Sequence, residues 1–248
     1  MQSDRPLRKA SILSLLRGAR PLVALLCVSG VLLFAWIADE ALEGSTGKLD
    51  AQILLAFRHP GDPALPIGPL WLLQVAIDLS ALGGFTVLWL LSAAAIGLLL
   101  TLRRWTEAVV LTVSLGGASV LNAVLKLGFH RVRPDVVPHL AVVSNASFPS
   151  GHAMLSAATY LTIGAMLAQA QPKLGPRVYI LGLAVVVAML VGISRLYLGV
   201  HWPSDVLAGW CLGAAWALAF WVFARKAKQA APSSPPPLAG EVARREAP

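Results

Sequence analysis

Residues 145–161 read NASFPSGHAMLSAATYL, and this stretch puts a titratable side chain at the point where a membrane helix begins. A Pro-Ser-Gly turn and His152 run directly into small and apolar residues. Ser150 is a typical N-cap residue, and Gly151 lets the backbone approach a ligand closely. The stretch therefore predicts a helix that begins at Gly151 and enters a bilayer, with an imidazole at its mouth.

The composition of the whole chain is that of a membrane protein. Of 248 residues, 57% are hydrophobic and 13% are charged, and the mean hydropathy is +0.71. Soluble domains rarely have such values, whereas apolar runs of about 20 residues are typical of membrane spans. The net charge of +8 would suggest nucleic acid as the partner of a soluble protein. Here the basic residues sort by membrane side, so we expect no nucleic-acid partner.

Hydropathy predicts an all-α, integral membrane bundle of six helices within residues 21–224. The first apolar run is long and lacks an obvious cleavage site, so we interpret it as a retained span and not as a signal peptide. Residues 1–20 are predicted as a basic cytoplasmic N-terminus and residues 225–248 as a disordered cytoplasmic tail. The expected spans are residues 21–38, 78–102, 108–127, 151–170, 178–193 and 206–224.

The distribution of charge orients these spans. With six spans and the N-terminus inside, most of the 20 Lys and Arg residues fall on the cytoplasmic side, as the positive-inside rule requires. We therefore expect a multi-pass protein of the cell (inner) membrane with both termini in the cytoplasm. Most of the basic residues left outside lie beside span ends, where a cation is costly without a partner or a role.

Three stretches contain most of the unusual polar residues: KLGFHRVRP (126–134), PSGH (149–152) and SRLYLGVHWPSD (194–205). All three fall at the outer ends of predicted spans. Together they would form one polar pocket at the periplasmic or extracellular face.

Such a pocket is suited to an anion. Lys126, Arg133 and Arg195 are fixed cations, and the arginine fork matches the oxygens of phosphate. Helices that begin near Gly151 and Pro203 would add the positive ends of their dipoles.

Two histidines in the same stretches could supply reactivity. His201 precedes Asp205 by four residues, so the carboxylate can accept a hydrogen bond from one ring nitrogen and leave the other as a nucleophile. His152 could protonate a leaving oxygen. Phosphate would lie in water at the mouth of the span, with a hydrocarbon tail in lipid.

These residues resemble the three signature motifs of the type 2 phosphatidic acid phosphatase family. The matches are Lys126 with Arg133-Pro134 after six intervening residues, PSGH at 149–152, and Ser-Arg-x-Tyr-x-x-x-His-x-x-x-Asp at 194–205. The family is related to bacterial acid phosphatases, glucose-6-phosphatase and vanadium haloperoxidases. Three motifs in order are a far more specific signal than one short pattern.

The resemblance implies a membrane lipid-phosphate phosphatase that needs no metal cofactor, and this sequence has no carboxylate cluster. His201 would attack phosphorus and form a phosphohistidine, Asp205 would orient it, and His152 would be the general acid. The phosphoryl oxygens would be held by Lys126, Arg133, Ser150, Gly151 and Arg195. The expected partners are a lipid substrate and the bilayer, and the oligomeric state is left open.

Alternatives remain for both the substrate and the function. Among candidate substrates, undecaprenyl diphosphate is favoured over phosphatidic acid and phosphatidylglycerol phosphate by family-level analogy alone. A phosphotransferase would pass the phosphoryl group to a second lipid. A haloperoxidase is disfavoured by the hydropathy, and a non-catalytic scaffold or transporter by the intact motifs.

Some polar residues near the motifs have no assigned chemistry. Lipid-headgroup contact and loop solvation are equally open for His130 and Arg131, which match no fixed motif position. Asp78 and Ser80 are interpreted as interfacial polar residues, with a place in the lining of the pocket as the alternative. Tyr197 is expected to pack against the site.

Overall fold

The computed structural model describes residues 10–143 and 146–230, and its architecture is helical, as predicted. In the described part of the chain, the β-structure is one short antiparallel hairpin of β1 and β2. The elements are α1 (Ala10–Glu43), α2 (Gly47–Leu55), β1 (Arg58–His59), β2 (Asp62–Pro66), α3 (Leu70–Ala81), α4 (Phe85–Thr101), α5 (Trp105–Phe129), α6 (Gly151–Gln169), α7 (Leu174–Tyr197) and α8 (Pro203–Ala230).

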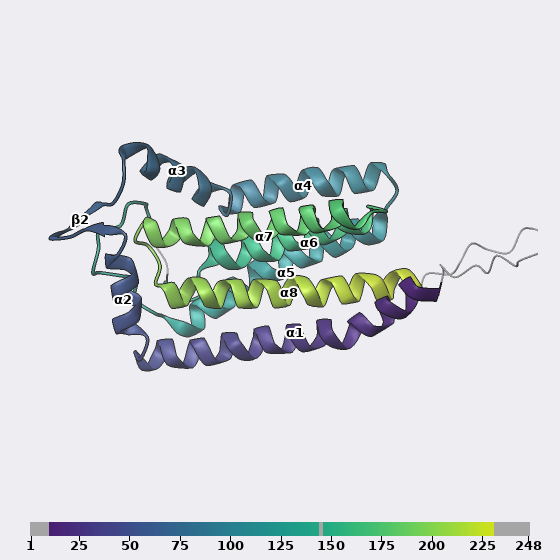
Figure 1. Ribbon diagram of the computed structural model, residues 1–248, viewed down its shortest axis with the longest axis horizontal. Helices are drawn as coiled ribbons and strands as arrows, with labels where there is room; N and C mark the ends of the chain where they lie inside the picture. The colour runs from purple at the N-terminus through teal and green to yellow at the C-terminus, as the bar shows by residue number, and fades with distance from the viewer. Residues whose placement is uncertain (1–9, 144–145, 231–248) are drawn as a thin grey trace, which may run out of the picture.

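The long helices lie side by side along one axis, and α2 lies across one end of the bundle (Figure 1). The hairpin, the start of α6 and the start of α8 are at this same end. Both ends of the described chain lie at the opposite end, together with the α4–α5 and α6–α7 turns. The two ends of the bundle therefore differ: one gathers the loops that carry the sequence motifs, and the other gathers the chain ends.

Helix α6 forms the centre of the bundle. It contacts α4, α5, α7 and α8, and most of its buried side chains are Ala, Ser, Thr or Gly. Small residues let helix backbones approach closely within a membrane. On α8, a Cβ added at Gly209 would lie 2.8 Å from the carbonyl oxygen of Ser150, so glycine is required for this approach. The contact lets α8 pack closely against the start of α6.

The outside of the bundle is apolar. Large hydrophobic side chains are exposed along α1, α4 and α7, including Leu32, Leu90 and Val178. By length and composition, four helices of the described chain could each cross a membrane: Pro21–Glu43 within α1, then α5, α7 and Pro203–Ala224 within α8. Helices α3 and α4 together form a fifth candidate that is bent by 50°. The structure is thus that of a multi-pass membrane protein.

Helix α6 is not among these candidates, so the count of six spans remains a prediction. Its position explains its lower hydropathy. A helix enclosed by four others has little surface toward lipid, and small and hydroxyl-bearing residues there serve helix packing.

The predicted span over residues 78–102 is not one continuous helix. The chain breaks between α3 and α4 at Leu82, Gly83 and Gly84. A Cβ added at Gly83 would lie 3.2 Å from the carbonyl oxygen of His152 and would also clash with the side chain of Val191. The break therefore places backbone directly against the first turn of α6.

The chain ends differ partly from expectation. Helix α1 begins at Ala10, inside the predicted basic N-terminus, and α8 continues to Ala230, inside the predicted disordered tail. Residues 1–9 and 231–248 lie outside the described part of the chain, and the predicted domain limits of 21 and 224 stay predictions.

Candidate active site

A pocket of about 400 Å³ opens where the ends of α5, α6 and α7 meet the loop before α8. Among the predicted site residues, those that line it are Lys126, Arg133, Gly151, His152, Arg195 and His201. Ser150 and Asp205 lie behind this lining. Segments separated by 75 residues in the chain thus converge on one cavity, because α6 and α8 begin side by side.

His201 lies in the short loop between α7 and α8 and is only 2% exposed. Its Nδ1 lies 3.4 Å from Oδ2 of Asp205 and 3.4 Å from Oγ of Ser147. Its Nε2 lies 3.4 Å from Nη1 of Arg133, a side chain of the pocket wall. One ring nitrogen therefore faces the carboxylate, and the other faces the cationic side of the site.

Burial lowers the pKa of His201 to about 4, although the hydrogen bond that its Nδ1–H donates to Asp205 acts in the opposite direction. Taking an imidazolium out of water is costly, and Arg195 and Arg133 add repulsion. His201 is therefore neutral at neutral pH and retains a lone pair.

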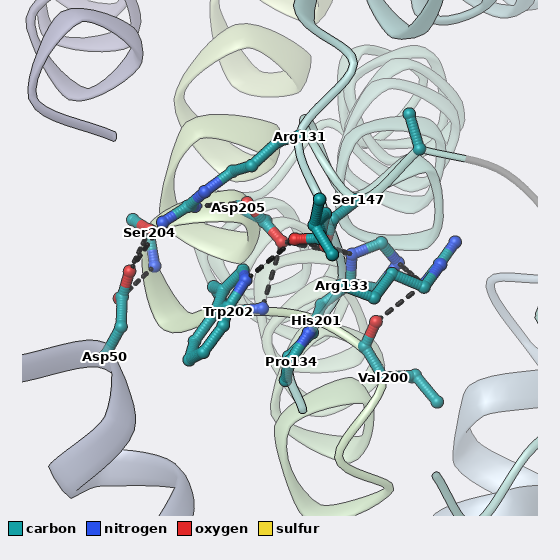
Figure 2. Close-up of polar contacts among 12 residues, drawn as sticks. Asp50, Arg131, Arg133, Pro134, Ser147, Val200, His201, Trp202, Ser204 and Asp205 are labelled. Atoms are coloured by element: carbon teal, nitrogen blue, oxygen red, sulfur yellow. Dashed lines mark hydrogen bonds and ion pairs between the residues drawn. The ribbon is translucent and has the colours of Figure 1, made fainter. Parts of the chain in front are cut away.

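Asp205 is fully buried in the first turn of α8, and each carboxylate oxygen has partners (Figure 2). Oδ2 accepts hydrogen bonds from the hydroxyl of Ser147 and from the backbone N–H of Trp202, the latter at 2.9 Å. Oδ1 forms an ion pair of 2.5 Å with Nη1 of Arg131. The side nearest His201 is thus held by neutral donors, and the far side is held by a cation.

The three predicted cations are each fixed by a bond to a neighbouring segment. Lys126 Nζ donates to the carbonyl of Ala146 at 2.8 Å, and Arg133 Nη1 donates to the carbonyl of Val200 at 2.6 Å. Arg195 is 5% exposed, donates from Nη1 to Oγ of Ser80 at 2.6 Å, and has a buried Nε without a protein partner. Like charges held around one cavity create a positive potential that favours an anion.

Ser150 occupies the N-cap position of α6, yet its side chain makes no capping hydrogen bond. Its Oγ is buried without a partner, and its backbone N–H donates to the carbonyl of Asp205 at 3.0 Å. This last bond joins the first turns of α6 and α8. Gly151 lines the pocket, and a Cβ added there would lie 3.1 Å from Nδ2 of Asn122.

The structure assigns contacts to four residues for which the sequence analysis gave no chemistry: Asp78, Ser80, Ser147 and Tyr197. Ser80 bonds Arg195 and is not merely interfacial, while Asp78 is exposed and bonds Gln74. Ser147 had no signal because its partner, Asp205, lies 58 residues away. Tyr197 donates its hydroxyl to the carbonyl of Ile67 at 2.7 Å and so ties α7 to the segment after the hairpin.

One wall of the pocket is apolar. It is formed by Phe85 at the start of α4, by Leu155 of α6, and by Val142 and Val143 of the loop before α6. A molecule with a phosphate group and a hydrocarbon part would therefore meet cations on one side and apolar side chains on the other.

Comparison with known proteins agrees with this arrangement. Residues 107–229 match the PAP2 superfamily, and this range contains all three sequence motifs. Phosphatidylglycerophosphatase B of Bacillus subtilis is 42% identical over 147 residues, which are 58% of this chain and 70% of that protein. Undecaprenyl-diphosphatase of Sulfolobus acidocaldarius is 38% identical over 122 residues, which are 47% of this chain and 55% of that protein.

A solved structure shows the same fold. The crystal structure of a transmembrane PAP2 type phosphatidylglycerolphosphate phosphatase from Bacillus subtilis aligns with a TM-score of 0.72 at 34% identity, over 81% of this chain and 96% of that chain. Fold, pocket and sequence likeness together define the class as membrane phosphatases that act on lipid phosphates. The chain belongs to the PAP2 superfamily.

Proposed function

We propose that this protein hydrolyses a phosphate group from a lipid mono- or diphosphate through a phosphohistidine on His201. The observation that carries the proposal is the pocket itself. Lys126, Arg133 and Arg195 surround a cavity that also holds His152 and a buried, neutral His201. The pocket lies at the end of an apolar bundle, where a headgroup can enter while the lipid tail stays in the bilayer.

In the first step, Nε2 of His201 attacks phosphorus and the bond from phosphorus to the lipid oxygen breaks. His152 gives its proton to that oxygen as the lipid leaves. The imidazole becomes cationic as it is phosphorylated, and Asp205 stabilises it by accepting the hydrogen bond from Nδ1. The cations of the pocket stabilise the charge on the equatorial oxygens.

In the second step, water attacks the phosphohistidine. The neutral His152 takes the proton from that water, the nitrogen–phosphorus bond breaks, and inorganic phosphate leaves. Both histidines return to their starting states. Because fixed cations neutralise the phosphoryl oxygens, the cycle is proposed to need no metal ion.

The substrate is proposed at the level of its class. Relatives of this chain are named for phosphatidylglycerol phosphate and for undecaprenyl diphosphate, and both are lipids with terminal phosphate groups. The pocket is proposed to face the outside of the cell membrane. The basic turns at Arg103–Arg104 and at Lys173–Arg177 lie at the other end of the bundle, where both described chain ends lie (Figure 1). That end is proposed to be cytoplasmic.

The purified full chain in detergent micelles should release phosphate from at least one of three lipids: phosphatidylglycerol phosphate, undecaprenyl diphosphate and phosphatidic acid. Release should continue in excess EDTA, and orthovanadate should inhibit it by mimicking five-coordinate phosphorus. A strict need for an added divalent ion would contradict the metal-free mechanism. If all three lipids are inert until an acceptor lipid is added, the protein is a phosphotransferase.

The pH dependence of kcat/KM should show an acid limb at about 4. This parameter reports the free enzyme, in which His201 must be neutral to attack phosphorus. Since burial lowers the pKa of His201 to about 4, the nucleophile is lost only when the pH falls to that range. An exposed imidazole would instead titrate at about 6.5.

The control is to measure two lipids whose phosphates ionise differently, because an acid limb that belongs to His201 does not move with the substrate. Enzyme held at low pH and returned to neutral pH should recover full activity. An acid limb at about 6.5 for both lipids would show that His201 is hydrated in the free enzyme.

A further inference from the structure

A buried chain of charges continues from Asp205 away from the pocket (Figure 2). Arg131 pairs through Nη1 with Oδ1 of Asp205 at 2.5 Å and through Nη2 with Oδ2 of Asp50 at 3.0 Å. Asp50 and Asp205 are buried, and the Arg131 side chain is only slightly exposed. Arg131 is absent from the pocket lining, and its guanidinium reaches the site through the carboxylate of Asp205.

Asp50 also holds the first turn of α8. Its Oδ1 accepts the backbone N–H of Ser204 at 2.9 Å, and its Oδ2 accepts the Ser204 hydroxyl at 2.5 Å. Ser204 Oγ in turn accepts a hydrogen bond from Arg131 Nη1 at 2.7 Å. A carboxylate from α2 thus caps the helix that carries Asp205. Asp50 lies before residues 107–229, the range that matches the superfamily.

Arg131 is further fixed by Trp202. The guanidinium carbon lies 5.7 Å from the centre of the Trp202 ring, at the distance of a cation–π contact. The indole nitrogen of Trp202 donates to the carbonyl of Val132 at 3.0 Å, next to Arg131 in the chain. The guanidinium therefore has a fixed position between two carboxylates and an aromatic face.

A buried carboxylate needs this arrangement to stay ionised. His201 is neutral in the resting enzyme, so the ion pair to Asp205 is the one made by Arg131. An unpaired buried charge is costly, and a carboxyl without its cation would take up a proton. A protonated carboxyl would no longer be a reliable acceptor for Nδ1–H of His201, and the tautomer needed for attack would be lost.

We propose that Arg131, held in place by Asp50 of α2, is a positioning residue that keeps Asp205 charged and turned toward His201. The proposal rests on the phosphatase function proposed above. Arg131 occupies Oδ1 and leaves Oδ2 to face Ser147, the N–H of Trp202 and the imidazole. The short helix α2 thereby becomes part of the catalytic apparatus without touching the substrate.

The test compares Arg131→Gln, Arg131→Lys and Asp50→Asn with wild type, by kcat and KM on the best lipid in micelles. Arg131→Gln should lower kcat by about 100-fold with little change in KM, because the pocket cations are untouched. Arg131→Lys should recover part of this loss, since an ammonium keeps the charge but not the fork. As the pH is lowered, kcat of Arg131→Gln should fall at a higher pH than kcat of wild type, because Asp205 takes up a proton more readily without its cation.

Asp50→Asn should lower kcat by about tenfold, because the amide oxygen can still accept the Ser204 N–H but no longer attracts Arg131. In the Arg131→Gln background, Asp50→Asn should lower kcat little further, since Asp50 acts through its ion pair with Arg131. The matched control is Lys48→Gln, which removes an exposed charge from α2 and should leave kcat unchanged.

Thermal unfolding in detergent identifies variants that do not fold. If Arg131→Gln does not fold, the comparison of kcat between Asp50→Asn and Lys48→Gln tests the proposal. Unchanged kcat in folded Arg131→Gln or Asp50→Asn overturns the positioning role, as does a raised KM with constant kcat. If wild type releases no phosphate from any lipid, the phosphatase function and this proposal both fall. If wild type is active and the variants match it, only this proposal falls.

Discussion

Replacing His201 by alanine should reduce kcat for phosphate release by on the order of 10⁴-fold or more, because it removes the atom that attacks phosphorus. The cations of the pocket remain, so lipid binding should persist. The same change should abolish the covalent intermediate. Wild type mixed with a lipid carrying labelled phosphate and quenched within milliseconds should yield an acid-labile phosphoprotein, and His201→Ala should yield none.

The matched control for this experiment is His59→Ala, which removes an exposed imidazole from the hairpin, outside the pocket. It should keep both turnover and labelling. If His201→Ala still forms the phosphoprotein, another side chain is the nucleophile. If turnover remains without labelling, water attacks the lipid phosphate directly.

The parts of the site that local sequence predicts are the helix starts and the spacings within one motif. Helix α6 begins at Gly151 and α8 begins at Pro203, as the N-terminal signals indicated. The separation of four residues between His201 and Asp205 places the imidazole and the carboxylate in contact. These features depend on only a few consecutive residues, so a short stretch contains the information for them.

The contacts that sequence analysis missed join distant segments. Ser80 bonds Arg195 across 115 residues, and Asp50 bonds Ser204 across 154 residues. No local pattern marks such pairs, because Ser80 and Asp50 each resemble a solvated polar residue when taken alone. Arg131 shows the difficulty directly. By sequence it could contact a headgroup or solvent, and the structure turns it inward between two carboxylates.

The segment between α1 and α3 is rich in polar residues, Pro and Gly. Its polar composition suggested solvent exposure, yet Arg58 is only 3% exposed and donates to the carbonyl of Tyr197 at 3.0 Å. Asp50 and Leu54, four residues apart on one face of α2, are both buried against the bundle. An amphipathic pattern indicates that one face is covered, but it does not distinguish coverage by lipid from coverage by protein.

Asp205→Asn should lower kcat by about 10²- to 10⁴-fold while leaving the vanadate inhibition constant nearly unchanged. An amide has the shape of the carboxylate but can present an N–H to Nδ1 of His201. That contact would favour the tautomer with its hydrogen on Nε2, and the attacking lone pair would be lost. Hydrogen bonds to Ala146, Val200 and Ser80 hold the three pocket cations, Lys126, Arg133 and Arg195, and these bonds do not involve residue 205, so anion binding should survive.

The control is Asp78→Asn, which neutralises an exposed acid on α3. The Asp78 side chain accepts a hydrogen bond from Gln74, on the same helix. This variant should retain wild-type kcat. Thermal unfolding separates loss of chemistry from loss of structure, because Asp205 also receives the N–H of Trp202 and the ion pair from Arg131. Folded Asp205→Asn with wild-type kcat would remove the carboxylate from the mechanism. A large rise in the vanadate inhibition constant would instead place residue 205 in anion binding, because its charge would then control the pocket and not the tautomer of His201.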